Sequence, residues 1–134
     1  MRENKLLLNS CIGRDKMTKV QIYNGEYLDQ TLEELLDEIA VSIKARYSDY
    51  AVILFGSYAR GDYCKDSDLD ICVLVPAITY NRSDMRVDVA CTIRDDFPLP
   101  FDVLLYTFDE FEELSKSKSR IQYKIKNEGV VLGA

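Results

Sequence analysis

Two apolar segments of the sequence carry aspartates at positions where aliphatic side chains otherwise prevail. Asp68 and Asp70 stand at the start of the run Leu69–Val75, and Asp102 is the second residue of the run Phe101–Tyr106. Side chains two apart in a strand point to the same face, with Cα atoms about 6.6 Å apart. Because aspartate is disfavoured in strands, its repetition there favours a functional site over a structural one.

Neighbouring strands in a sheet lie about 4.8 Å apart, so pairing of these two segments would bring the three carboxylates together. Each close pair would repel by roughly 2–3 kcal/mol at an effective dielectric constant of 20. This repulsion is large for a domain whose whole stability is about 5–15 kcal/mol. A divalent cation removes it, and oxygen ligands select Mg²⁺ or Mn²⁺ over zinc. We therefore predict that Asp68, Asp70 and Asp102 are catalytic residues and metal ligands.

The dipeptide Gly56–Ser57 is the second chemical feature. It follows the continuous apolar run Ala51–Phe55 and precedes a short helical turn that ends at Gly61. Free backbone amides at the start of a helix attract phosphate, and glycine allows the backbone to approach a ligand closely. The Ser57 hydroxyl adds a donor, and Arg60, one helical turn further on, is a candidate for a phosphate contact. We predict that Gly56, Ser57 and Arg60 bind phosphate.

Hydrophobic periodicity predicts the elements that must position these residues. Thr31 and Glu34 form a capping-box pattern, which begins a helix that reaches about Tyr47. The run 51–55 is typical of a central strand buried on both faces. The later elements are a helical turn at 58–60, a strand at 69–75, a helix at 84–97, a strand at 101–106, a helical stretch at 108–127 that is split near 115–119 and capped by Gly129, and an edge strand at 130–132. This order predicts an α+β fold: a small mixed β-sheet with helices packed on it.

The composition narrows the classes of function. The 134 residues suit one domain, which we assign to residues 31–134; residues 1–30 are interpreted as an N-terminal extension of unknown role, with Met17 as an alternative start. The absence of histidine excludes imidazole bases and most zinc sites, and the four cysteines lack metal-site spacing. With no apolar run of membrane-spanning length, we expect a cytoplasmic protein. The net charge of −6 argues against nucleic acid as the main partner.

The spacing of the two features is informative: Gly56–Ser57, ten residues, Asp68, one residue and Asp70. This G-S-x10-D-x-D pattern closely resembles the minimal nucleotidyltransferases of the DNA polymerase β-like superfamily, over roughly residues 31 to 132. The resemblance implies that the Gly-Ser turn holds the β- and γ-phosphates of a nucleoside triphosphate, ATP in our interpretation. It also implies that Asp68 and Asp70 bind two divalent metal ions, and that Asp102 joins a metal and helps to deprotonate the acceptor hydroxyl.

No segment after Asp102 is long enough for a separate acceptor-binding domain. Minimal members of the resembled family often act with a helical HEPN-type partner, as the antitoxin that adds AMP to a tyrosine of the toxin. We expect such a toxin–antitoxin pair here. Two alternatives stay open: a small-molecule enzyme of the antibiotic-modifying type that works as a homo-oligomer, namely a dimer, and an antitoxin that inhibits its partner by binding alone.

Overall fold

The computed structural model describes residues 19–21, 27–64 and 66–133, with side chains from residue 31 onward. A four-stranded sheet forms its centre, in the order β5-β4-β3-β6. The bounds of these strands are β3 Ala51–Phe55, β4 Leu69–Val75, β5 Phe101–Thr107 and β6 Val130–Leu132. β5 runs parallel to β4, whereas β3 is antiparallel to both β4 and β6. The sheet is therefore mixed, which confirms the predicted fold class.

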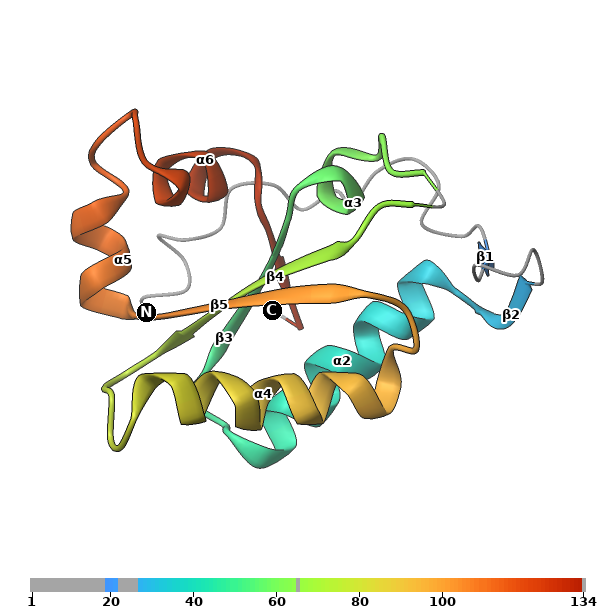
Figure 1. The fold of residues 1–134 in the computed structure, drawn as a ribbon, viewed down its shortest axis with the longest axis horizontal. Coiled ribbons are helices and arrows are strands. Elements are labelled where there is room, and N and C mark those ends of the chain that lie inside the picture. Colours follow the sequence, from blue (N-terminus) through green and yellow to red (C-terminus); the bar gives the residue numbers. More distant parts are fainter. Residues whose placement is uncertain (1–18, 22–26, 65, 134) are drawn as a thin grey trace.

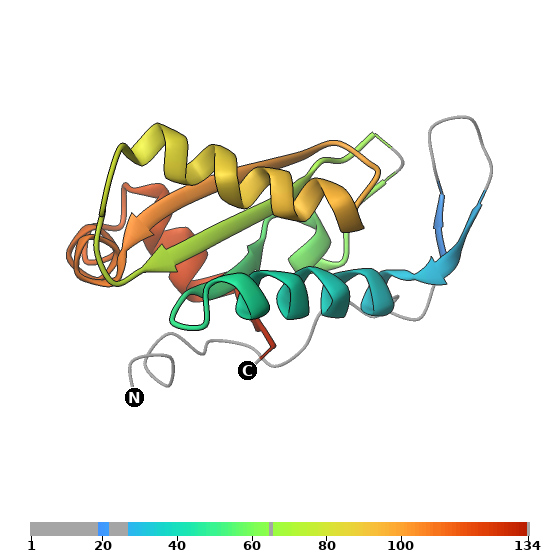
Figure 2. The ribbon, with the colours of Figure 1, turned by 90° about the horizontal axis from the view of Figure 1, so that it is seen from below.

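Helices cover both faces of this sheet (Figures 1 and 2). The first face packs against α2, Leu32–Arg46, and α4, Arg82–Asp96, through a core in which the buried strand residues include Ile71, Val73 and Val103. The second face packs against α5, Phe108–Leu114, and α6, Ile121–Glu128, around Phe111 and Ile125. Since side chains alternate along a strand, β3 and β4 are apolar on both sides, as a central strand requires.

Helix starts are set by side-chain caps. Thr31 caps α2: its amide donates to Oε1 of Glu34 at 2.8 Å, and the Glu34 amide donates to its hydroxyl at 3.2 Å. This reciprocal arrangement confirms the predicted capping box. Thr107 and Glu110 make the same box at α5, with 2.8 and 3.0 Å bonds, where β5 passes directly into the helix. The two strands that precede α2, β1 Lys19–Gln21 and β2 Tyr27–Thr31, form a separate antiparallel pair.

One detail of the predicted elements was wrong. The helix expected from residue 84 begins at Arg82, because the side chain of Asn81 caps it by accepting from the Asp84 amide at 3.1 Å. Gly129 ends α6 as its C-cap, which confirms the prediction; with φ −75° and ψ 160° its backbone is extended. Its role is steric: a Cβ there would lie 2.5 Å from the Ile125 carbonyl oxygen and 2.7 Å from Cγ2 of Ile53. Glycine thus lets the chain pass close to α6 and β3.

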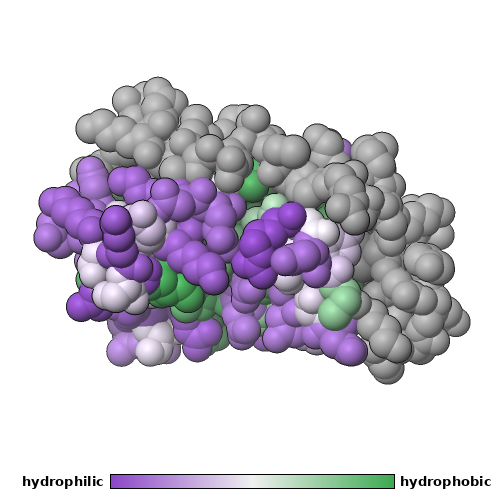
Figure 3. Space-filling view, turned by 90° about the horizontal axis from the view of Figure 1, so that it is seen from above, coloured by the Kyte–Doolittle hydropathy of each residue, from purple (hydrophilic) through white to green (hydrophobic). Residues whose placement is uncertain are grey.

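The described surface seen from above Figure 1 is mainly hydrophilic, with small hydrophobic areas between polar side chains (Figure 3). No helix in the described ranges combines the length and apolar character that a bilayer crossing requires. The buried apolar side chains lie in the two layers on either side of the sheet, whereas Val41, Tyr80, Val87 and Ile121 are exposed.

Candidate active site

The connection from β3 to the short helix α3, Ser57–Arg60, is a tight turn at Gly56. Gly56 has φ 77° and ψ −157°, a backbone conformation that side-chain-bearing residues rarely adopt. A Cβ on Gly56 would also overlap the carboxylate of Asp70. Glycine is therefore required here for two reasons, and the second of them places the Asp70 carboxylate directly against the Gly56–Ser57 turn.

Backbone amides at this turn are available to a ligand. The first amides to bond back are those of Ala59 and Arg60, which donate to the Gly56 carbonyl oxygen at 3.1 and 3.0 Å. The amides of Ser57 and Tyr58 come before them in the helix, where no preceding turn offers an acceptor. Together with the half-exposed Ser57 hydroxyl, they form a set of donors beside the Asp70 carboxylate.

Strand pairing brings two of the three aspartates together. Asp70 and Asp102 are direct partners in the parallel β4–β5 register, so their side chains leave the sheet on the same face. Asp68 lies one residue before β4, whose bounds are those predicted. Asp70 is half-buried, whereas Asp68 and Asp102 are exposed.

The charges of these residues interact. The pKa of Asp70 is raised above its ordinary value, first by burial and then by the negative charges of Asp102 and Asp68; the guanidinium of Arg60 opposes the rise. Such a shift identifies a carboxylate that would gain from a nearby cation. Within the described ranges, however, no three acidic or cysteine side chains converge on one point as a ready-made metal cage. The carboxylates are thus neighbours that suit hard divalent ions by donor type, and they would need to reorient their side chains to share one.

Arg60 is bound by two carboxylates. Its Nε donates to Asp62 at 3.2 Å and its Nη1 donates to Glu128 at 2.9 Å, which links α3 to the end of α6. Both acceptors raise the pKa of Arg60, which keeps the guanidinium charged. A phosphate contact by Arg60 would therefore exchange one of these carboxylates for a phosphate oxygen.

A stack of aromatic side chains packs next to the site. It was not predicted from the sequence. The buried Tyr58 ring stacks on Tyr63 at 4.4 Å between centroids and meets Phe97 edge-on at 6.4 Å. Burial, Tyr63 and the charge of Asp68 together raise the pKa of Tyr58 to about 12. Tyr58 therefore anchors α3 to the core and carries a protonated hydroxyl in the electrostatic field of Asp68. The only sequence signal for this role was its place directly after Gly56–Ser57.

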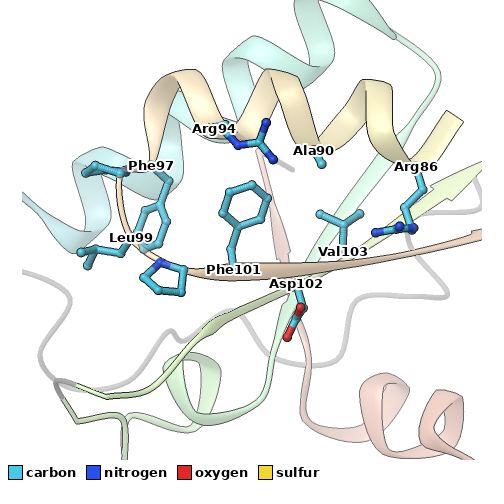
Figure 4. A pocket seen from close by; sticks show the side chains of 10 residues that line it. Arg86, Ala90, Arg94, Phe97, Leu99, Phe101, Asp102 and Val103 are labelled. Atoms are coloured by element: carbon cyan, nitrogen blue, oxygen red, sulfur yellow. The ribbon is translucent and has the colours of Figure 1, made fainter. Parts of the chain in front are cut away.

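A groove of about 550 Å³ lies on the outer side of β5, between that strand and α4 (Figure 4). Phe101 and Val103 point from β5 toward α4, whereas Asp102 points to the opposite side, and Arg86 and Arg94 extend from the helix. No pattern in the sequence predicts this groove, because its two walls come from separate segments.

Comparison with known proteins is consistent with this geometry. A family model described as "Nucleotidyltransferase domain" matches residues 36–129, a range that contains Gly56, Ser57 and all three aspartates. "Putative protein adenylyltransferase MJ0604" of Methanocaldococcus jannaschii is 31% identical over 104 residues, which cover 75% of this chain and 96% of that protein. Two further proteins of the same organism carry the same descriptive name. MJ0141 is 32% identical over 57% of this chain and 72% of its own length. MJ1305 is 36% identical over 50% of this chain and 44% of its own length.

Proposed function

Since the chain belongs to the nucleotidyltransferase-domain family, we propose that it transfers AMP from ATP to a hydroxyl group on a partner protein. The observation that carries this proposal is the contact between the two motifs: the Asp70 carboxylate packs against Gly56 and is paired in register with Asp102. The hydrogen-bond donors that suit phosphate and the carboxylates that suit metal ions therefore lie side by side. The names of the three relatives support a protein as acceptor.

In the proposed mechanism, Ser57 and the amides of Ser57 and Tyr58 hold the β- and γ-phosphates. Asp68, Asp70 and Asp102 would bind two Mg²⁺ or Mn²⁺ ions. Such ions, when bound, supply positive charge to both the attacking and the leaving oxygen. Their fit is supported by the hard-oxygen donor set and by the raised pKa of Asp70.

Asp102 is the proposed general base, since it is the exposed member of the Asp70–Asp102 pair and can be reached from the edge of the sheet. It accepts the proton of the acceptor hydroxyl as the hydroxyl oxygen bonds to the α-phosphorus. The bond between the α-phosphorus and its bridging oxygen breaks, and pyrophosphate leaves. The products are an AMP ester of the acceptor and pyrophosphate. A HEPN-type toxin with a tyrosine acceptor is the partner we propose.

The test is label transfer from α-labelled ATP with Mg²⁺ to the protein encoded by a neighbouring gene, compared with transfer to tRNA and to an aminoglycoside. We expect label on the protein alone. Asp102→Asn should lower transfer by about 100-fold or more while leaving ATP affinity within a fewfold of the parent, because its task is at the acceptor.

Two other outcomes would separate the alternatives. Label on tRNA or on the aminoglycoside alone would refute a protein acceptor while keeping the enzyme class. Absence of transfer, together with inhibition of the partner that survives Asp102→Asn, would identify an antitoxin that acts by binding alone.

A further inference from the structure

The groove between α4 and β5 lies beside the proposed general base, and its charge differs from that of the chain as a whole. The chain has a net charge of −6, yet the ionisable residues that line the groove are Arg86, Arg94 and Asp102. Arg86, Ala90 and Arg94 are spaced by four, so they form one stripe along α4. Neither arginine makes a hydrogen bond or an ion pair with any residue that the structure describes.

The strand that forms the other wall has an open edge. Among the described strands, β5 pairs with β4 alone. The Leu69 amide donates to the Pro100 carbonyl oxygen at 3.1 Å, while the carbonyl oxygen of Leu105 accepts from Arg82 at 3.1 Å on the other side of the strand. Because backbone groups alternate along a strand, Phe101 and Val103 present their polar groups to the same outer edge as Leu105. Arg82 thus occupies the far end of this edge, and the part beside the groove stays open to a pairing strand.

We propose that the acceptor segment binds as an added strand on β5, with acidic residues directed to Arg86 and Arg94; this inference rests on the proposed transfer function. A strand on this edge would alternate its side chains between the two faces. One set enters the apolar groove at Phe101 and Val103. The other set lies on the face of Asp102, where a directly opposite side chain has its Cβ about 4.5–5.5 Å from that of Asp102.

This geometry selects the substrate. The hydroxyl-bearing residue must stand opposite Asp102, and its neighbours at one position to either side must be apolar to enter the groove. Residues three positions away on that same groove face would reach toward the two arginines, and acidic side chains there complement them. The substrate class is therefore an extended peptide segment with a central hydroxyl residue, apolar neighbours and acidic ends.

The test uses a fluorescent acetylated peptide, Glu-Thr-Leu-Tyr-Leu-Thr-Glu, with full-length protein. Fluorescence anisotropy measures binding, and label from α-labelled ATP measures transfer. We expect Arg86→Glu with Arg94→Glu to weaken binding of this peptide by about tenfold or more, and to strengthen binding of the version with Lys at both ends. Lys118→Glu with Arg120→Glu changes the net charge equally at the α5–α6 connection and should have no such effect. A peptide with N-methylated amides on one edge should bind neither variant nor parent.

Other outcomes overturn the proposal. Equal binding of the acidic and basic peptides would contradict the role of the two arginines. Undiminished binding of the N-methylated peptide would contradict the pairing of the segment with β5. If the arginine reversals instead dissociate a homodimer without affecting peptide binding, the groove belongs to a second copy of the chain. The rise in melting temperature caused by Mg²⁺-ATP is measured in parallel. If Mg²⁺-ATP does not stabilise the parent protein, the transfer function itself is contradicted. If it does stabilise the parent but the peptide does not bind, only the docking site is contradicted.

Discussion

The ionised side chain of Asp70 is held in an unfavourable environment. Its pKa lies above the ordinary aspartate value of 3.8 because of burial and the charges of Asp102 and Asp68. Between the ordinary and the raised pKa, the folded protein binds this proton more tightly than the unfolded chain does. The contribution of Asp70 therefore lowers the free energy of unfolding as the pH rises through that window, and this cost is absent below pH 3.8.

We predict that Asp70→Asn raises the melting temperature at pH 7 in the absence of divalent ions. The difference from the parent should narrow as the pH falls toward the ordinary value of 3.8, because Asp70 in the folded protein takes up its proton above that value. Thermal denaturation across this pH range measures both effects. Asp37→Asn, at an exposed position on α2, is the control that removes one carboxylate elsewhere. A lower melting temperature for Asp70→Asn at pH 7 would contradict the electrostatic cost.

Gly56 provides a second prediction at this scale. Gly56→Ala adds a side chain at φ 77° and forces it against Asp70, so we expect a loss of about 2–4 kcal/mol in the free energy of unfolding. The response to ATP should be lost with it. Gly61→Ala, at φ 86°, shares the backbone strain and serves as the control, with an expected loss of about 1 kcal/mol. Urea denaturation measures both, and equal losses would show that the contact with Asp70 has no consequence.

At the level of elements, α3 and α6 are joined by the ion pair between Arg60 and Glu128, whose side chains are 40% and 27% exposed. A pair this accessible contributes about 1 kcal/mol or less to stability. Its larger consequence is for the site, since Glu128 holds a guanidinium that stands beside the proposed phosphate-binding turn.

We predict that Glu128→Gln lowers the free energy of unfolding by no more than about 1 kcal/mol and tightens ATP binding by a fewfold, because Nη1 of Arg60 loses its carboxylate partner and becomes free to contact phosphate. Titration with ATP and Mg²⁺ measures the affinity. Glu113→Gln removes a comparable but remote partner, that of Lys116, and should leave the affinity unchanged. Weaker ATP binding by Glu128→Gln would indicate that Glu128 positions Arg60 rather than competing with phosphate for it.

For the molecule as a whole, a ligand that binds only the folded state must stabilise it. We predict that Mg²⁺-ATP, at about 100 times its Kd, raises the melting temperature by roughly 5–10 °C. Asp68→Asn combined with Asp70→Asn should abolish the metal-dependent part of this shift and keep the fold. The control pair Asp37→Asn with Asp95→Asn removes two exposed carboxylates on α2 and α4. A double site variant that still responds as the parent does would exclude these aspartates as metal ligands.

Much of the fold followed from local rules. Short stretches of neighbouring residues predict three features that the structure confirms: the Thr31 capping box, the doubly buried run 51–55 and the interruption between α5 and α6. The start of α4 was placed two residues late because the Asn81 cap, although an ordinary signal, was overlooked. Gly129 caps the last helix as predicted, but part of its steric constraint comes from Ile53, which is distant in the chain.

The sequence by itself determined which residues could do chemistry, because aspartates in apolar strands and glycine after a buried strand break local propensities in a recognisable way. Tertiary structure decided how they meet: the parallel register pairs Asp70 with Asp102, and the turn at Gly56 rests on Asp70. It alone decided that Arg60 is held by Glu128, 68 residues away, and that an arginine-lined groove borders β5. Spacing along the chain determines on which face of a strand or helix a side chain lies. Its neighbours are determined by strand order and helix packing, because these depend on burial summed over the whole core.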